Sequence, residues 1–159
     1  MKKIHKLLKI IFPITLSFIN IHADTTVQKR ENQTIKTIPF TLDINNIQHK
    51  KGGQIIVFIF LEEGFPKKHE QTFSKFSYPT KEKKMSIQIS IPDKRDFAIK
   101  ILHDENMDGQ VTKNWTGIYP KDGLGFSNDA KIGFGPPSFE EAKINARNTI
   151  NSNISIIYY

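Results

Sequence analysis

The sequence predicts an all-β protein folded as an antiparallel β-sandwich. Several short segments alternate apolar and polar residues with the two-residue period of a strand that buries one face. Turn-forming residues separate these segments at intervals of roughly 8 to 12 residues, which is typical of sandwiches. The chain of 159 residues contains no cysteine, so neither a disulfide nor a thiolate zinc site can support the fold.

Six segments carry strand signals. The segment 54–61 is almost wholly apolar, as expected for a central strand of a packed sheet. A buried helix is the alternative there, but the short length and the β-branched and aromatic residues favour a strand. The segment 97–101 alternates apolar residues with Ala98 and Lys100 and leads into His103. In chain order the six segments are 39–44, 54–61, 73–78, 85–91, 97–101 and 153–158.

Two local motifs indicate where elements begin. Gly52 and Gly53 predict a turn before the apolar strand, because glycine adopts positive φ without strain. Ser138 and Glu141 have the spacing of a capping box, in which each satisfies a backbone N–H of the other. One short helix is therefore expected near 138–144.

The start of the chain has the features of a secretory signal peptide over residues 1–23. A basic segment precedes an apolar run, 10–21, and the small residue Ala23 stands at the expected cleavage point. An uncleaved membrane anchor or a buried helix is the alternative. Residues 24–33 indicate a flexible leader, and 34–159 a single domain. We therefore expect an exported protein, periplasmic or secreted, with no transmembrane segment after cleavage.

The basic charge of the chain belongs largely to the predicted signal. The formal net charge is +7, and four lysines but no acidic residue lie in residues 1–23. The remaining chain therefore carries +3, which is too little to indicate a nucleic-acid-binding surface. Nucleic acid is not an expected partner.

A loop after the strand at 97–101 has the pattern of a calcium site. Asp104, Asn106 and Asp108 bear side-chain oxygens at alternate positions, so that all three can point into one concavity. Gly109 follows and allows a sharp turn, and Gln110 can offer its backbone carbonyl. Calcium prefers a shell of such oxygens.

The calcium pattern is incomplete. The twelfth position is Trp115 instead of a bidentate glutamate, and the ninth is Thr112, so a further carboxylate such as Asp122 or Asp129 must come from outside the loop. The alternative is a tight turn in which the same carboxylates accept backbone N–H bonds. The predicted ligands of Ca²⁺ or a similar cation are Asp104, Asn106, Asp108, Gln110 and Asp122.

Other chemical candidates carry weaker signals. His103 at a strand end is more typical of a structural histidine than of a catalytic one. Ser127 lacks the second glycine and the strand–helix context of a nucleophile elbow. Glu140 and Glu141 are adjacent on the expected helix and point to different faces, so capping explains them better than catalysis. The sequence therefore predicts no catalytic residue.

Aromatic side chains in the second half of the chain allow two interpretations. We expect Trp115, Phe126, Phe134 and Phe139 to pack in the core or against loops. The alternative is an exposed aromatic set that binds sugar.

Several short motifs recur in order over residues 97–144. They are His103-Asp104-Glu105-Asn106, Asp108-Gly109, Gly117-Ile118-Tyr119-Pro120, Gly125-Phe126-Ser127-Asn128 and Pro137-Ser138-Phe139. In these motifs the sequence resembles the bacterial family known as domain of unknown function 2141.

The resemblance implies an exported transthyretin-like or immunoglobulin-like sandwich of about seven to eight strands, and no activity that can be transferred. Thr112 replaces a family aspartate, which weakens the metal interpretation, whereas Asp122 keeps a carboxylate where the family has glutamate.

Three functional hypotheses follow. The first is a non-enzymatic binding or accessory domain of the cell envelope or the secreted fraction, with an unknown protein, peptide or glycan partner. The second is a hydrolase that uses His103, Asp104, Ser127 or Asp122, which would have to converge in a pocket. The third is a carbohydrate- or peptide-binding module that uses exposed aromatic residues, namely Trp115, Tyr119 and Phe126. We favour the first.

Overall fold

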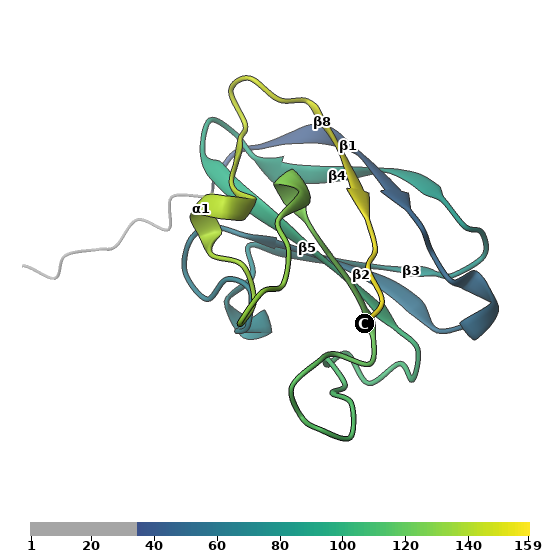
Figure 1. Ribbon diagram of the computed structural model, residues 1–159. Coiled ribbons are helices and arrows are strands. Elements are labelled where there is room, and N and C mark those ends of the chain that lie inside the picture. The colour runs from purple at the N-terminus through teal and green to yellow at the C-terminus, as the bar shows by residue number, and fades with distance from the viewer. Residues whose placement is uncertain (1–34) are drawn as a thin grey trace, which may run out of the picture. The chain divides into compact units, whose positions relative to one another are not determined.

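The computed structural model describes residues 35–159, and its ribbon is shown in Figure 1. The predicted signal peptide, 1–23, and leader, 24–33, lie outside the described residues. Residues Thr34–Tyr159 form one compact unit with its own apolar core, so we expect this part of the chain to fold by itself. Among the described residues, no helix is long and apolar enough to cross a membrane.

The smaller of two sheets has three strands in the order β4-β1-β8. It contains β1 (Thr37–Asn45), β4 (Met85–Pro92) and β8 (Asn151–Ser155). β1 pairs with β4 in antiparallel register and with β8 in parallel register. The parallel pair is a departure from the wholly antiparallel sandwich that the sequence predicted, and it arises because the chain returns to β1 only after crossing the other sheet.

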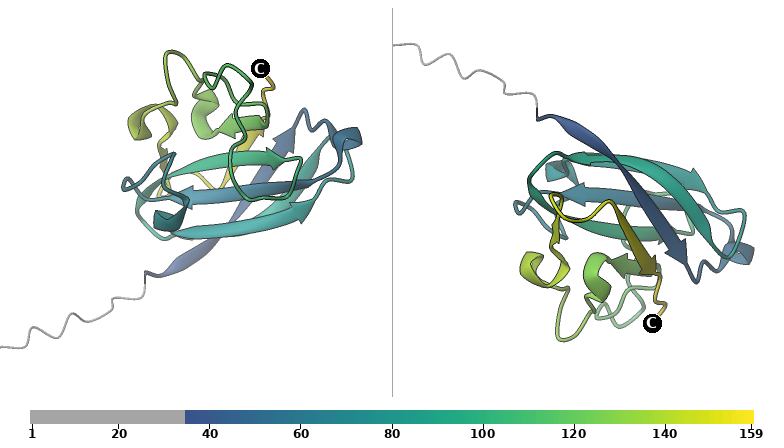
Figure 2. Two further views of the ribbon diagram at one scale, coloured as in Figure 1. Left: turned by 90° about the horizontal axis from the view of Figure 1, so that it is seen from below. Right: turned by 90° about the horizontal axis from the view of Figure 1, so that it is seen from above.

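The larger sheet is antiparallel and has β5 at its centre. β3 (Ser74–Pro79), β2 (Gln54–Phe60), β5 (Asp96–Asp104) and β6 (Gly123–Phe126) follow one another across it. The short β7 (Ile144–Asn145) also pairs with β5. Figure 2 shows that the last third of the chain, coloured green to yellow, gathers on one side of the teal strands.

Helical structure is limited to short pieces. Three 3-10 turns are present, η1 (His49–Lys51), η2 (His69–Gln71) and η3 (Ser127–Asp129). The one α-helix among the described residues, α1 (Phe139–Ala142), begins after Ser138, whose capping box with its third helical residue is complete. The predicted helix near 138–144 is thus confirmed, although it is shorter.

The prediction of an all-β sandwich is confirmed. Each of the six predicted segments contains a strand, although the strand in the last segment, 153–158, ends at Ser155. The sequence did not indicate β6 or β7. β6 contains Gly123 and Gly125, which carry no strand signal. β7 is only two residues long.

The main core lies between the two sheets. Inward residues of β1 meet inward residues of β2 and β5, and Phe40 packs edge-to-face against Phe97 at 5.5 Å between ring centroids. Burying these side chains supplies the principal favourable term in folding. The core includes Phe40, Leu42, Ile44, Ile55, Val57, Ile59, Phe97, Ile99, Ile101, Ile154 and Ile156.

A second apolar cluster covers the outer face of the larger sheet. Phe58 and Leu102 alternate with the core residues of β2 and β5, and Phe126 of β6 joins them. Loops, not a third sheet, cover this cluster, with Val111 and Ile132 packed against it. β5 is therefore buried on both faces, although its alternating pattern is typical of a strand with one polar face.

The two sheets meet where the chain ends. Leu124 of β6 and Ile157 exchange backbone hydrogen bonds of 2.9 and 2.8 Å. Side chains at Gly123 and Gly125 would collide with Tyr158 and Ile154, respectively. The two glycines thus permit the C-terminal segment to lie directly on β6.

The predicted turn before β2 holds the end of β5 in place. Gly52 and Gly53 have φ values of +75° and +76°, and the Gly52 carbonyl accepts a hydrogen bond from the buried ring of His103. A Cβ at Gly53 would meet the Asp104 backbone and would lie 2.7 Å from Cα of Glu105, whereas one at Gly52 would meet nothing within 4 Å. The two glycines therefore share a backbone conformation but differ in the space around them.

We expect Gly53→Ala to lower the free energy of unfolding more than Gly52→Ala. Both variants incur the cost of positive φ, roughly 1–2 kcal/mol. Only Gly53→Ala adds a collision with backbone, which costs roughly 1–3 kcal/mol more. Denaturant unfolding of both variants measures the difference, and equal losses of stability would contradict the close approach.

Candidate functional site

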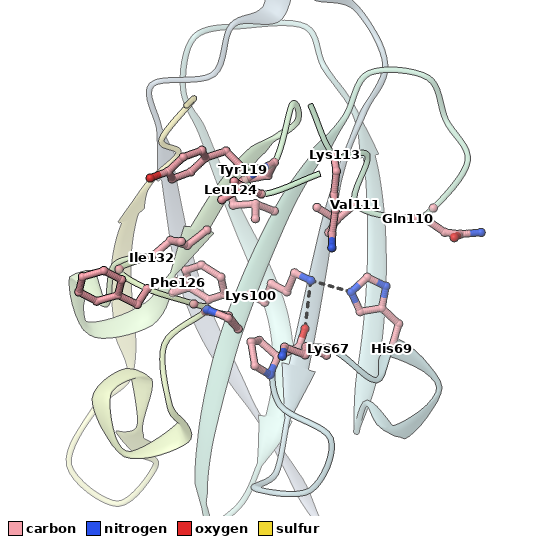
Figure 3. A pocket seen from close by; sticks show the side chains of 18 of the residues that line it. Lys67, His69, Lys100, Gln110, Val111, Lys113, Tyr119, Leu124, Phe126 and Ile132 are labelled. Carbon is pink, nitrogen blue, oxygen red and sulfur yellow. Dashed lines mark hydrogen bonds between the residues drawn. The ribbon is translucent and has the colours of Figure 1, made fainter. Parts of the chain in front are cut away.

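A cavity of about 800 Å³ lies on the outer face of the larger sheet. Lys100 of β5 and Leu124 and Phe126 of β6 contribute to its floor, and three loop segments, 66–70, 109–120 and 132–136, form its walls. Figure 3 shows Lys100 between the loop that carries His69 and the aromatic and aliphatic wall on the opposite side. The cavity is the place where the loops that cover the second cluster do not close over the sheet.

A cross-strand row of four side chains runs beneath the cavity. Lys75, Phe58, Lys100 and Phe126 are register partners across β3, β2, β5 and β6. The two ammonium groups approach the Phe58 ring, with Nζ to centroid distances of 5.5 Å for Lys75 and 5.7 Å for Lys100. The ring of His69 stacks on Phe58 at 4.0 Å. Phe58 thus supports the cationic groups on its face, as cation–π attraction favours.

Lys100 is buried, with 4% of its surface exposed, yet its ammonium group reaches the cavity. Nζ donates hydrogen bonds to the Pro66 carbonyl at 3.0 Å and to Nε2 of His69 at 2.7 Å (Figure 3). An ammonium group has three N–H donors. No carboxylate of residues 35–159 forms an ion pair with it. Its two partners are neutral acceptors, which leave the positive charge uncompensated.

Burial changes the protonation of both cavity bases. It lowers the pKa of Lys100 to about 8. Burial, followed by the charge of Lys100, lowers the pKa of His69 to about 4. At neutral pH His69 is therefore a neutral acceptor, and Lys100 is mostly an ammonium ion.

The lining of the cavity combines apolar surface with a basic rim. Val111, Leu124, Phe126 and Ile132 present carbon atoms, as Figure 3 shows. Lys67 and Lys113 stand at the rim, where Glu70 is the one acidic lining residue. Such a site suits a molecule with one anionic group and an apolar body.

Of the predicted calcium residues, only Gln110 lines the cavity; Asp104, Asn106 and Asp108 lie at the end of β5 and in the turn that follows it. Asp104 is fully buried, and its carboxylate accepts hydrogen bonds from the backbone N–H groups of Asp108 at 3.2 Å and Gly109 at 2.9 Å, and from Nε2 of Gln54 at 2.9 Å. Asp108 and Asn106 are exposed and bond to each other. These contacts are those of the alternative in which the carboxylates close a turn.

Asp122 closes the next loop. Its carboxylate accepts the backbone N–H of Thr112 at 2.6 Å. Burial is the main cause that raises its pKa, and the charges of Asp104 and Glu105 act in the same direction. The backbone N–H of Gln110 donates to Asp108 at 2.7 Å, and Asp129 is exposed on η3.

The predicted ligand set combines carboxylates with amide and carbonyl oxygens. Within residues 35–159, no group of three or more His, Asp or Glu side chains is placed to hold a metal ion. Calcium binding stays a prediction from the sequence, and the geometry of the loop supports the turn alternative better.

The catalytic candidates make structural contacts. Nε2 of His103 donates to the Gly52 carbonyl at 2.8 Å, which leaves Nδ1 to accept from the Tyr158 hydroxyl at 2.7 Å. Ser127 is buried, accepts the N–H of Ile99 at 2.9 Å and donates to the carbonyl of Ala142. The convergence that the hydrolase hypothesis requires is not present in these contacts.

The two glutamates on α1 also have local partners. Glu141 accepts from the backbone and hydroxyl of Ser138, and Glu140 pairs with Lys143 at 2.7 Å. Capping, as predicted, explains Glu141.

The expectation for the aromatic residues is wrong for two of them. Phe126 is buried and Phe139 is half-buried, but Trp115 and Phe134 are fully exposed, at 97% and 118%. Neither packs against the cluster beneath the loops. Of the aromatic residues in the third hypothesis, Trp115 and Tyr119 are therefore exposed, whereas Phe126 is buried.

Lys100 and His69 were not indicated as site residues by the sequence. The available signal was the single charge at Lys100 within an otherwise apolar segment, 97–102. Lys100 is buried only because loops cover β5, and the alternation of residues along the strand does not reveal these loops. His69 approaches Lys100 through the loop that contains η2, about thirty residues away in sequence.

The comparisons with known proteins identify a family and no characterised relative. Residues 42–154 match the family described as uncharacterised proteins conserved in bacteria, DUF2141. This match confirms the resemblance seen in the motifs of the second half and extends it to β1. No match was found among curated proteins or among solved structures.

We expect Asp104→Ala to destabilise the protein more than Asp108→Ala, by roughly 1–3 kcal/mol, because it leaves buried donors without an acceptor. Denaturant unfolding in chelator measures this difference, and equal effects would contradict the turn role.

Melting in millimolar calcium tests the metal separately. If the carboxylates only close the turn, the melting temperature in calcium should equal the melting temperature in chelator. A higher melting temperature in calcium that is lost in Asp108→Asn would establish the calcium site.

We expect Lys100→Met to remove a pH dependence of stability. The folded pKa of Lys100, about 8, lies below the ordinary lysine value of 10.5, so the unfolded chain binds more protons between these two pH values. The wild-type free energy of unfolding should therefore rise with pH above about 8, by at most about 1.4 kcal/mol per pH unit. Chemical unfolding of wild type and variant between about pH 7.5 and 9.5 measures the rise.

Lys81→Met is the control for this experiment, because Lys81 is exposed on a turn. In the control, the free energy of unfolding should still rise with pH. If it also rises in Lys100→Met, the buried ammonium group does not titrate in this pH range.

Proposed function

This chain belongs to the DUF2141 family, and we propose that it is an exported, non-enzymatic binding domain that holds a small organic anion above Lys100. The supporting observation is the buried ammonium group of Lys100, which faces a cavity and has no ion-pair partner within residues 35–159. The anionic group of the ligand would neutralise the charge of Lys100.

The energetics favour a ligand of opposite charge. Removing an ammonium ion from water is costly unless hydrogen bonds and an opposite charge compensate it. The Pro66 carbonyl and Nε2 of His69 compensate in part, and the lowered pKa of Lys100 reflects the remainder. A carboxylate, sulfonate or phosphate oxygen near Nζ would supply a charge-assisted hydrogen bond in a site of low polarity.

The walls suggest the rest of the ligand. About 800 Å³ is within the usual range for small-molecule sites. Val111, Leu124, Phe126 and Ile132 would contact an apolar body. The ligand class is therefore an amphipathic organic anion, with its acidic group toward Lys100.

Binding is favoured over catalysis by the positions of the reactive side chains. Ser127 and His103 are buried with structural partners, and neither lines the cavity. His69 does line the cavity, but Lys100 occupies its Nε2.

Export rests on the features of residues 1–23, which precede the described part of the chain. The basic start, the apolar run and Ala23 support cleavage after that residue. The absence of cysteine excludes lipid attachment through a cysteine at the cleavage site. A periplasmic or secreted domain would meet its ligand outside the cytoplasm.

Octanoate is a suitable probe, and octanol is its uncharged counterpart. We expect octanoate to bind the wild type more tightly than octanol, and Lys100→Met to weaken octanoate binding by roughly tenfold to a hundredfold, as loss of a charged hydrogen bond predicts. The affinity for octanol should change little. Octanoate affinity should fall as pH rises through about 8, where Lys100 loses its charge. Isothermal titration calorimetry measures each of these affinities.

Lys81→Met again provides the matched loss of one positive charge at a distant exposed position. It should bind octanoate as the wild type does. Equal octanoate affinities for Lys100→Met and wild type would refute the proposed site.

A further inference from the structure

Two loops at the mouth of the cavity expose large apolar side chains. Trp115 is 97% exposed, Ile118 72% and Phe134 118%, and Tyr119 is 47% exposed. Trp115, Ile118 and Tyr119 belong to the loop 109–121, and Phe134 to the loop 130–137. Ile118, Tyr119 and Phe134 all line the cavity, so both loops border the same opening.

The first of these loops is a closed hairpin, which projects beyond the end of β5 in Figure 1. Lys113 pairs with Pro120, and the backbone N–H of Gly117 donates to the Asn114 carbonyl at 2.9 Å in the terminal turn. Trp115 therefore stands at the tip of an ordered turn. Its exposure is a consequence of this turn, since the indole has almost no protein surface to cover it.

The charges of the two loops have one sign. Lys113, Lys121 and Lys131 are exposed, and residues 109–121 and 130–137 contain no acidic residue. Lys67 adds a fourth positive charge at the cavity rim, where Glu70 is the one acidic lining residue. The exposed Asp108 and Asp129 flank the two loops, so the positive charges lie within the loops and the negative charges at their bases. The surface formed by the two loops is thus both apolar at its tips and basic around them.

We infer that this surface, the loops 109–121 and 130–137, docks on the face of a lipid bilayer that contains anionic lipids. Tryptophan and tyrosine favour the boundary between headgroups and acyl chains, and lysines near an anionic surface add electrostatic attraction. Trp115, Phe134 and Ile118 would enter the boundary, and the lysines would contact headgroups. The cavity mouth then opens toward the lipid.

A glycan is a poorer match to the same residues. Aromatic platforms for sugars need rings held in place, and the Trp115 ring has almost no contacts to hold it. Neither loop contains an acidic side chain, so Glu70 is the one carboxylate among the lining residues that could accept a sugar hydroxyl group. Charge complementarity favours the anionic bilayer.

The chain supplies its own reporter, because Trp115 is its single tryptophan. The experiment uses residues 34–159, which form one compact unit and exclude the apolar run at 10–21. Vesicles of phosphatidylglycerol and phosphatidylcholine should shift the Trp115 emission to shorter wavelength and sediment the protein. Vesicles of phosphatidylcholine alone should bind at least tenfold more weakly, and added salt should weaken the anionic interaction.

Matched variants distinguish vesicle binding through this surface from non-specific hydrophobic binding. Phe134→Ser and Trp115→Ser should each weaken co-sedimentation severalfold, whereas Ile150→Ser, at a 74% exposed isoleucine outside the two loops, should not. Lys113→Gln with Lys121→Gln and Lys131→Gln should abolish the preference for anionic vesicles. The control replaces three lysines outside the two loops, Lys50, Lys81 and Lys84, with glutamine. This triple variant should keep the preference for anionic vesicles.

The outcomes are distinct from those of the anion site. Lys100→Met should bind vesicles as the wild type does, so loss of octanoate binding alone leaves this inference standing. No emission shift with anionic vesicles, or equal binding by Phe134→Ser and Ile150→Ser, would overturn it. An emission response to soluble oligosaccharides without one to vesicles would overturn it in favour of sugar binding.

Discussion

The burial of β5 on both faces is the constraint on which the rest of the structure depends. One face, with Phe97, Ile99 and Ile101, completes the core between the sheets. The other face lies under loops, so every polar group on the strand must find a partner inside the protein. Lys100 finds two neutral acceptors, and Asp104 finds backbone N–H groups. The cavity and the turn after β5 are both results of this requirement.

Buried polar residues here organise loops as well as the strand. Asp104 closes the turn after β5, Asp122 anchors the base of the hairpin that carries Trp115, and His103 joins the turn before β2 to Tyr158 near the chain end. Each carboxylate accepts N–H groups that would otherwise be unsatisfied. The loops above the sheet are therefore ordered by groups below them, and they present exposed residues at a defined place around the cavity.

Prediction from the sequence succeeded where the signal is local. Alternation located β1, β4 and β5, paired glycines located the turn before β2, and the Ser138 capping box located α1. It failed for β6, because the two glycines of this strand have low strand propensity. They are explained by the close approach of the C-terminal segment, which leaves no room for larger side chains. The candidate site was missed for a similar reason, because Lys100 becomes unusual only when loops distant in sequence cover it.

The sequence by itself determined the fold class, the family and most strands. These features depend on periodicity and short motifs, which involve neighbours along the chain. Only the tertiary structure decided which oxygens of Asp104 and Asp122 are already occupied, which aromatic rings are exposed, and that Lys100 faces a cavity. The reason is that burial and hydrogen-bond partners are set by segments far apart in the chain, brought together by the two-sided burial of β5.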